Sequence, residues 1–161
     1  MLIVKWIIAF IVASIASAAF AVIFHSPKDE IVPAGIVGGF GWLFYLIFLY
    51  LGLSVVWSSF VATVGLAYIA RLLSYKRKNP ATIYLVTGIF PLVPGLGIYN
   101  TGYSLFMNDN SATTLALGLQ TIEAAVAIAF GMGLVLSLPS ICFFVRQGKV
   151  KNETNNNHKS K

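Results

Sequence analysis

Long apolar stretches alternate with short polar breaks along this chain. A helix rises about 1.5 Å per residue, so roughly 20 apolar residues are enough to cross the hydrocarbon core of a membrane. The stretches that meet this length span residues 3–24, 31–51, 55–73, 81–107 and 112–138. The pattern predicts an all-α integral membrane protein. We expect a bundle of five transmembrane helices within residues 1–145, followed by a polar, disordered cytoplasmic tail over 146–161.

The composition supports a membrane protein over a soluble domain. Of the 161 residues, 58% are hydrophobic and only 10% are charged, whereas a soluble domain carries roughly 25% charged residues. A cleaved signal peptide is the alternative reading of the first stretch. That stretch is longer than the ~7–15 residues of a signal-peptide core, so we expect it to be a membrane helix.

The basic residues predict the orientation in the membrane. If the five stretches alternate across the bilayer, segments 25–30 and 71–80 and the tail share one side. Ten of the 11 Lys and Arg residues fall on that side, and only Lys5 falls on the other. Because cytoplasmic loops are rich in Lys and Arg, we predict a cell-membrane protein with its N-terminus outside and its C-terminus inside. The net charge of +6 then needs no nucleic-acid partner, since no basic segment carries base-stacking aromatic residues.

Sequence signals for catalysis, metals and cofactors are missing. A single cysteine, Cys142, allows neither an intrachain disulfide nor a multi-cysteine metal site. The two histidines, His25 and His158, are far apart in the sequence and have no companion at metal-ligand spacing. No Gly-rich phosphate loop followed by Lys and Ser or Thr occurs. We therefore predict a protein that is not an enzyme and that needs no cofactor.

The fourth stretch carries two prolines near its middle. Pro91 and Pro94 lack a backbone N–H, and Gly95 loosens the chain further, so we predict a broken helix. Free backbone groups at membrane depth are tolerated only inside protein or beside a water-filled cavity, and transporters use such breaks as substrate sites. The alternative is a proline kink whose polar groups are satisfied by neighbouring helices. The functional hypothesis assigns substrate binding to Pro91, Pro94, Gly95, Tyr99, Asn100 and Thr101.

Glu123 is the acidic residue that lies well inside an apolar stretch, and Gln120 lies one turn before it. Carboxylates in membrane helices are costly, usually face the bundle interior and often mark proton or substrate paths. The hypothesis is that Glu123, with Gln120, couples transport to protons or binds a substrate amine. The alternative is a protonated, hydrogen-bonded glutamic acid with a structural role.

Small residues in the second stretch predict close helix packing. Gly35 and Gly39 have GxxxG spacing, and Gly38 and Gly41 add to the same run. Such residues let helix backbones approach closely, within one chain or between subunits. The alternative interpretation is that these glycines help to form a substrate path. Trp42 is expected to pack against a neighbour or to lie at the membrane interface.

Taken together, these motifs resemble the small subunit of the threonine/serine exporter family, which corresponds to the C-terminal half of the fused exporters. The matching order lies between residues 24 and 103. The residues that carry it are Phe24 to Lys28, Ala34-Gly35, Gly38 to Trp42, Arg71, Lys78 to Ala81, and Phe90 to Gly95 with Tyr99. The resemblance implies proton-dependent export of threonine, serine or a similar small metabolite, together with a larger companion membrane subunit. It assigns no binding residue.

Three alternatives remain beside a threonine/serine exporter component. Related two-subunit systems are linked to succinate, so the resemblance also allows a dicarboxylate exporter subunit. A membrane scaffold that does not itself transport, and a passive channel, fit the same helix pattern, although no ring of charge defines ion selectivity. Because five helices make a small transporter, we expect a partner subunit, a homo-oligomer or both.

Overall fold

The computed structural model describes residues 2–107 and 111–138, and all of its regular secondary structure is helical. The tail over 146–161, Cys142 and Pro139 lie outside the described residues. The helices run in the order α1 (Leu2–Ile23), α2 (Lys28–Tyr50), α3 (Val55–Arg77), α4 (Ala81–Ile89), the 3-10 helix η1 (Phe90–Leu92), α5 (Gly95–Phe106) and α6 (Ser111–Ser137).

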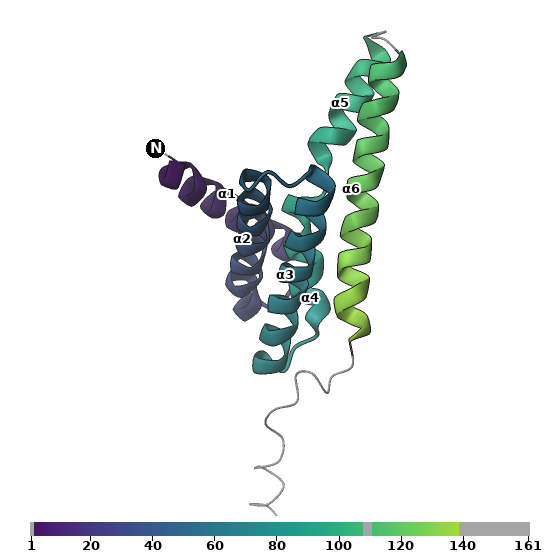
Figure 1. Cartoon of the computed structure of the whole chain (residues 1–161). Helices are drawn as coiled ribbons and strands as arrows, with labels where there is room; N and C mark the ends of the chain where they lie inside the picture. Colours follow the sequence, from purple (N-terminus) through teal and green to yellow (C-terminus); the bar gives the residue numbers. More distant parts are fainter. Residues whose placement is uncertain (1, 108–110, 139–161) are drawn as a thin grey trace, which may run out of the picture.

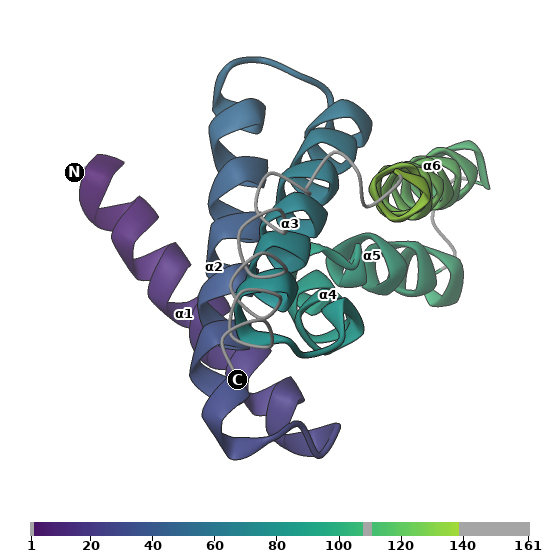
Figure 2. The ribbon, with the colours of Figure 1, turned by 90° about the horizontal axis from the view of Figure 1, so that it is seen from below.

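Helices α2, α3 and α4 form the centre of the bundle (Figures 1 and 2). Helix α1 packs on α2 at one side, and α6 packs on α3 at the other. Helix α5 continues upward from α4 and lies against the first half of α6, so that this hairpin extends past the loop between α2 and α3 (Figure 1). The start of α1 and the end of α6 lie at opposite ends of the bundle, as an odd number of crossings requires.

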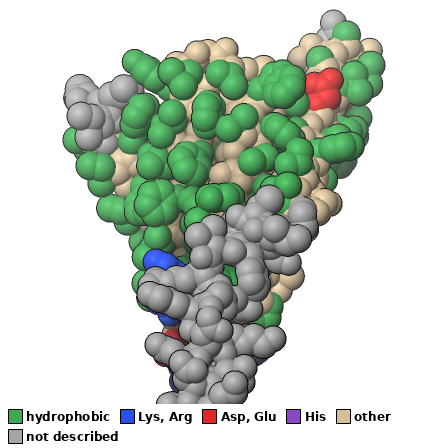
Figure 3. All heavy atoms as spheres, turned by 60° about the horizontal axis from the view of Figure 1, so that its bottom comes forward, with side chains coloured by type: hydrophobic (Ala, Val, Ile, Leu, Met, Phe, Trp, Pro, Cys, Tyr) green, Lys and Arg blue, Asp and Glu red, His purple; other side chains and the backbone are tan. Residues whose placement is uncertain are grey.

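Four of these helices, α1, α2, α3 and α6, are long and apolar enough to cross a membrane. The segments Ala81–Leu92 and Gly95–Phe106 meet the same test only as a pair, and they are bent by 42° at the break between them. Counting the pair as one span gives five. The predicted all-α membrane bundle with a broken fourth helix is therefore confirmed. Figure 3 shows a face on which hydrophobic side chains predominate over charged ones.

Helices α2 and α3 are longer than predicted, because each includes charged residues next to its apolar stretch. Helix α2 starts at Lys28, three residues before the apolar stretch, and α3 continues to Arg77 instead of ending at 73. Asp29 and Glu30 lie in the first turn of α2, and Lys76 and Arg77 lie in the last turn of α3. Negative charges at the N-terminus of α2 and positive charges at the C-terminus of α3 interact favourably with the helix dipoles, so the helices continue into these charged residues.

The glycines of α2 lie where helices come closest. A Cβ added at Gly35 would be 2.7 Å from the carbonyl oxygen of Ser14, and one at Gly38 would be 1.9 Å from Oγ of Ser17, both on α1. A Cβ added at Gly41 would be 2.4 Å from Leu66 of α3. Gly39 likewise faces Ser14 and Phe10. Close approach of backbones gives the dense packing that holds helices together in lipid.

A buried polar cluster links three helices at the end of the bundle opposite the α2–α3 loop. Glu30 is 4% exposed, and its carboxylate accepts hydrogen bonds from Nδ2 of Asn79 at 2.8 Å and from Oη of Tyr84 at 2.5 Å. Nη1 of Arg77 is 3.3 Å from the same carboxylate. A buried charge is tolerated when it is paired and hydrogen-bonded, as it is here.

Pro33 explains a further contact of this cluster. Because proline has no N–H, the carbonyl of Asp29, four residues earlier, has no intrahelical donor. Nη1 of Arg77 donates to that carbonyl at 3.3 Å. One guanidinium group therefore serves both the carboxylate of Glu30 and the backbone group that Pro33 leaves free.

Candidate functional site

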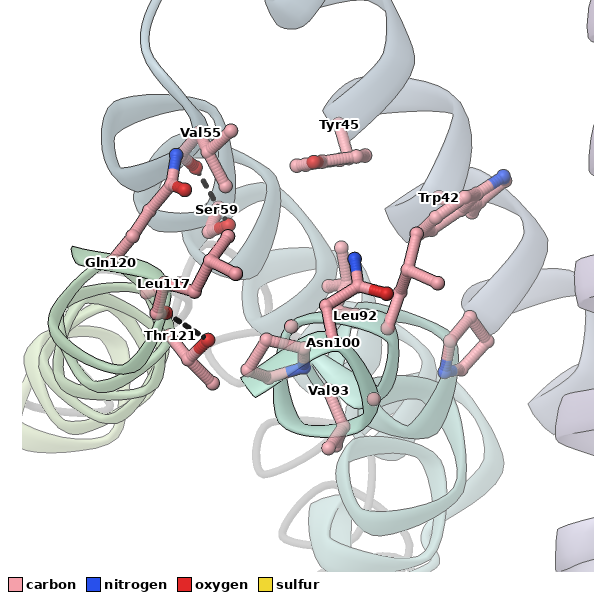
Figure 4. A pocket seen from close by; sticks show the side chains of 16 residues that line it. Trp42, Tyr45, Val55, Ser59, Leu92, Val93, Asn100, Leu117, Gln120 and Thr121 are labelled. Carbon is pink, nitrogen blue, oxygen red and sulfur yellow. Dashed lines mark hydrogen bonds between the residues drawn. The ribbon is translucent and has the colours of Figure 1, made fainter. Parts of the chain in front are cut away.

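A cavity of about 400 Å³ opens beside the break between α4 and α5. Trp42 and Tyr45 of α2 line one side of it, Val55 and Ser59 of α3 a second, and α6 a third (Figure 4). The break itself and the start of α5 complete the wall, from Pro91 to Gly97 and at Asn100. Trp42 and Tyr45 come from the C-terminal half of α2, and Val55 and Ser59 come from the start of α3. The cavity therefore lies nearer the α2–α3 loop than the middle of the bundle.

The break is built from short turns that replace helical hydrogen bonds. The N–H of Val93 donates to the carbonyl oxygens of Ile89 at 3.1 Å and Phe90 at 3.3 Å. The carbonyl of Phe90, which loses its helical donor to Pro94, is thereby satisfied. The N–H of Gly95 donates to Val93 at 2.6 Å, and α5 starts when Ile98 donates to the carbonyl of Pro94 at 3.0 Å. The N-terminus of α5, where N–H groups have no helical acceptor, forms part of the cavity wall.

Some polar side chains of the cavity have hydrogen-bonding groups free for a ligand, and others use theirs within the protein. The hydroxyls of Ser59 and Thr121 donate to carbonyls of their own helices, at 2.8 Å and 2.7 Å. The amides of Asn100 and Gln120 make no hydrogen bond to any other described residue, and Figure 4 shows both beside the open space. Trp42 and Tyr45 stack with ring centroids 5.1 Å apart. Among the described residues, no Lys, Arg, His, Asp or Glu lines the cavity.

The residues assigned to substrate binding from the sequence separate into two groups. Pro91, Pro94, Gly95 and Asn100 line the cavity. Tyr99 and Thr101 do not. Tyr99 is 65% exposed on the outer side of α5, where it stacks on Tyr103 with ring centroids 6.2 Å apart.

Thr101 faces α6 and not the cavity. Its hydroxyl donates to the carbonyl of Gly97 at 2.8 Å. A Cβ added at Gly118 of α6 would meet its methyl carbon at 3.4 Å. Thr101 therefore contributes to the α5–α6 contact, and its hydroxyl proton is used within its own helix.

Gln120 and Glu123 lie one turn apart on α6, but only Gln120 lines the cavity. Gln120 lines the cavity, as does Ala124. Glu123 is exposed on the outer surface and has no hydrogen bond or ion pair to another described residue. We expected Glu123 to face the interior of the bundle, but the structure places it on the outer surface. Its neighbours Gln120, one turn before it, and Ala124 line the cavity, so Glu123 lies at the same depth, just outside the cavity wall.

Sequence reasoning missed several residues of the site. Tyr45, Ser59 and Thr121 line the cavity, but no local motif distinguishes them from packing residues. Trp42, which was expected only to pack or to lie at the interface, is also part of the wall. The buried Glu30 was assigned to a polar break. The three donors on Glu30 are 47 to 54 residues away in the sequence, so no local signal indicates them.

Comparison with known proteins places these features in a family. Residues 9–138 match the family described as "Threonine/Serine exporter, ThrE". The chain is 27% identical over 124 residues to a probable threonine/serine exporter of Mycobacterium tuberculosis, covering 77% of this chain and 23% of that protein. It is 31% identical over 121 residues to a threonine/serine exporter of Corynebacterium glutamicum, covering 73% of this chain and 24% of that protein.

A third relative is an uncharacterized protein of Haemophilus influenzae, 24% identical over 135 residues, which cover 82% of this chain and 46% of the relative. No solved structure matches the chain significantly. The chain thus spans from 23% to 46% of the length of these relatives. The family match covers most of the helical bundle, including the break and the cavity. The chain belongs to the threonine/serine exporter family.

Proposed function

We propose that this chain is one component of a membrane exporter for threonine, serine or a similar small polar metabolite, working with a larger companion subunit. The observation that carries the proposal is the cavity at the broken helix. It offers the side-chain amides of Asn100 and Gln120, which no other described residue engages, next to the N-terminus of α5. Most of the length of the relatives lies outside the region that this chain matches, which supports a companion that supplies the rest of the transporter.

The chemistry of the cavity favours a zwitterion over a dicarboxylate. An amino acid carries one positive and one negative charge, so a wall of neutral dipoles can hold it without a counter-ion. The α5 N-terminus suits the carboxylate, and the stacked rings of Trp42 and Tyr45 suit the ammonium group. A dicarboxylate would bring two negative charges to a wall without a described cation. The succinate-type alternative would therefore need basic residues from the companion.

For proton coupling, Glu123 remains the candidate in α6, with Gln120 nearby on the cavity side. Because Glu123 lies outside the cavity, it would act at a surface shared with the companion. The test is export measured across a range of external pH with Glu123→Gln. A proton-coupling role predicts a lower rate and a flattened pH profile. An unchanged rate with an unchanged profile would reject the role.

The proposed orientation has the N-terminus outside and the end of α6 in the cytoplasm. Arg71, Lys76, Arg77 and Lys78 lie toward the end of α3 that would face the cytoplasm. The cavity then lies nearer the outer surface, and the Glu30 cluster lies at the inner end. Cysteine labelling from either side of intact cells at Lys5 and Lys78, each changed to cysteine in a Cys142→Ser background, tests this orientation.

Export from cells tests the function directly. Cells loaded with threonine, serine or succinate would express the chain alone, the companion alone, or both. The proposal predicts threonine or serine efflux only when both are present. Efflux without a proton gradient would favour a passive channel. A scaffold predicts that variants of Pro91 and Asn100 change assembly but leave flux unchanged in the assembled protein.

A further inference from the structure

The outer face of α6 carries a stripe of exposed side chains at helical spacing. Glu123 is exposed near the middle of the helix. Residues three and four apart on a helix share a face. The apolar members of this stripe, exposed by between 50% and 72%, are Leu119, Ile122, Val126 and Phe130. We call these four residues and Glu123 the α6 stripe.

Contact between this face and lipid is energetically unfavourable. The α6 stripe lies in a helix long enough to cross the membrane, and an acidic side chain that faces lipid in such a helix is energetically costly. In the part of the chain that the structure describes, nothing donates to the carboxylate of Glu123. A donor from another chain would remove this cost.

The side of α6 that faces the bundle is already occupied. Ala124, Ala127, Ile128, Gly131 and Val135 are buried, and α6 packs on α3 and α5. A Cβ added at Gly131 would be 3.0 Å from the carbonyl oxygen of Phe60 on α3. The α6 stripe thus lies on the side of α6 that is turned away from α3 and α5.

Charge decides between the possible protein occupants. A second copy docked through the same stripe would place two carboxylates against each other without a cation, and like charges disfavour each other strongly in a medium of low dielectric. A different helix with a Lys, an Arg or a hydroxyl or amide donor at this depth would satisfy Glu123. The relatives contain much more chain than the region matched here, which supplies room for such a helix.

We propose that the α6 stripe docks a transmembrane helix of the companion subunit that presents a cationic or hydrogen-bond-donating side chain to Glu123. This proposal rests on the proposed function for the existence of a companion, but not for its transport activity. Since Gln120 and Ala124 line the cavity, the interface at Glu123 would adjoin the substrate site on the same helix.

Spin labels can test the occupant without measuring transport. A label at Ile122→Cys in a Cys142→Ser background would report oxygen accessibility in proteoliposomes of the chain alone and of the chain co-purified with its companion. The matched label, at Ile15→Cys, lies on the exposed side of α1, at the other side of the bundle from α6 (Figure 2). We expect accessibility at position 122 to fall several-fold only in the complex, with position 15 as the internal reference.

Two results would overturn the proposal. A low accessibility at position 122 in the chain alone would indicate a second copy as the occupant. A high accessibility in an intact complex would indicate that lipid covers the stripe. If the complex forms and protects position 122 but exports nothing, the proposed function fails while the docking proposal stands.

Substitution of the carboxylate gives a second, independent measurement. We expect Glu123→Leu to lower the amount of companion co-purified at least tenfold, because the donor on the partner would be left buried without an acceptor. Ala125→Leu is the matched control, since it adds a leucine at the same depth on another exposed side of α6. Undiminished co-purification with Glu123→Leu would contradict the pairing.

Discussion

The phenol oxygen of Tyr84 donates to the carboxylate of Glu30 at 2.5 Å, joining the start of α4 to the start of α2. Both side chains are buried, with Tyr84 0% and Glu30 4% exposed. Helix α4 is held by this bond at one end and leads into the broken segment at the other. The cavity is therefore attached to a fixed point at the opposite end of the bundle.

We expect Tyr84→Phe to lower the free energy of unfolding by about 1.5–3 kcal/mol, the usual contribution of a hydrogen bond to a charged group. Thermal unfolding in detergent micelles measures the change. Tyr75→Phe is the control, because Tyr75 is 47% exposed and should have little effect. Equal stability of the two variants would contradict the structural role of the bond.

Gly38→Ala should destabilise the contact between α1 and α2. The added Cβ would lie 1.9 Å from Oγ of Ser17, so the helices must separate. Overpacking of this kind costs about 1–3 kcal/mol. The matched control is Gly133→Ala on α6, where a Cβ meets nothing within 4 Å. If Ser17→Gly does not rescue Gly38→Ala in the same unfolding assay, the clash is not the cause.

Restoring the backbone at the break should reduce export. The double change Pro91→Ala and Pro94→Ala supplies the two missing N–H groups and favours a continuous helix across the cavity wall. We expect at least a tenfold loss of threonine efflux, with normal amounts of assembled protein in the membrane. Pro33→Ala is the control, since Pro33 lies in α2 outside the cavity. Full activity of the double variant would show that the break is not required.

Asn100 and Tyr99 are neighbours in the sequence, but only Asn100 lines the cavity. We expect Asn100→Leu to lower efflux about tenfold, which corresponds to the loss of roughly 1.4 kcal/mol of binding from a hydrogen bond. Tyr99→Phe should remain within twofold of the unchanged protein. A larger loss from Tyr99→Phe than from Asn100→Leu would place the site on the outer side of α5.

The sequence predicted the helices well because crossing a membrane sets both their length and their composition. The break was also predictable, since Pro91 and Pro94 cannot donate hydrogen bonds. What could not be predicted is the direction in which each helix faces. In a soluble protein the apolar side points inward, whereas here lipid and bundle interior are both apolar. Glu123 was therefore expected at the interior and Tyr99 at the substrate site, and the structure places both on the outer surface.

The Glu30 cluster shows a second limit of sequence reasoning. Charged residues at the end of a membrane helix are normally assigned to water, and the polar break before residue 31 gave no reason to expect burial. The pairing with Arg77 and Tyr84 arises only when α3 and α4 pack beside α2. Such partners become visible only in three dimensions.

Protection of the cavity by substrate would show directly whether the broken helix binds threonine. Asn100→Cys in a Cys142→Ser background would be labelled with a small hydrophilic thiol reagent in the assembled exporter, with and without threonine. We expect threonine to slow labelling at position 100 several-fold and to leave labelling of Tyr99→Cys unchanged. Equal labelling of Asn100→Cys at zero and saturating threonine would contradict a substrate site at the broken helix.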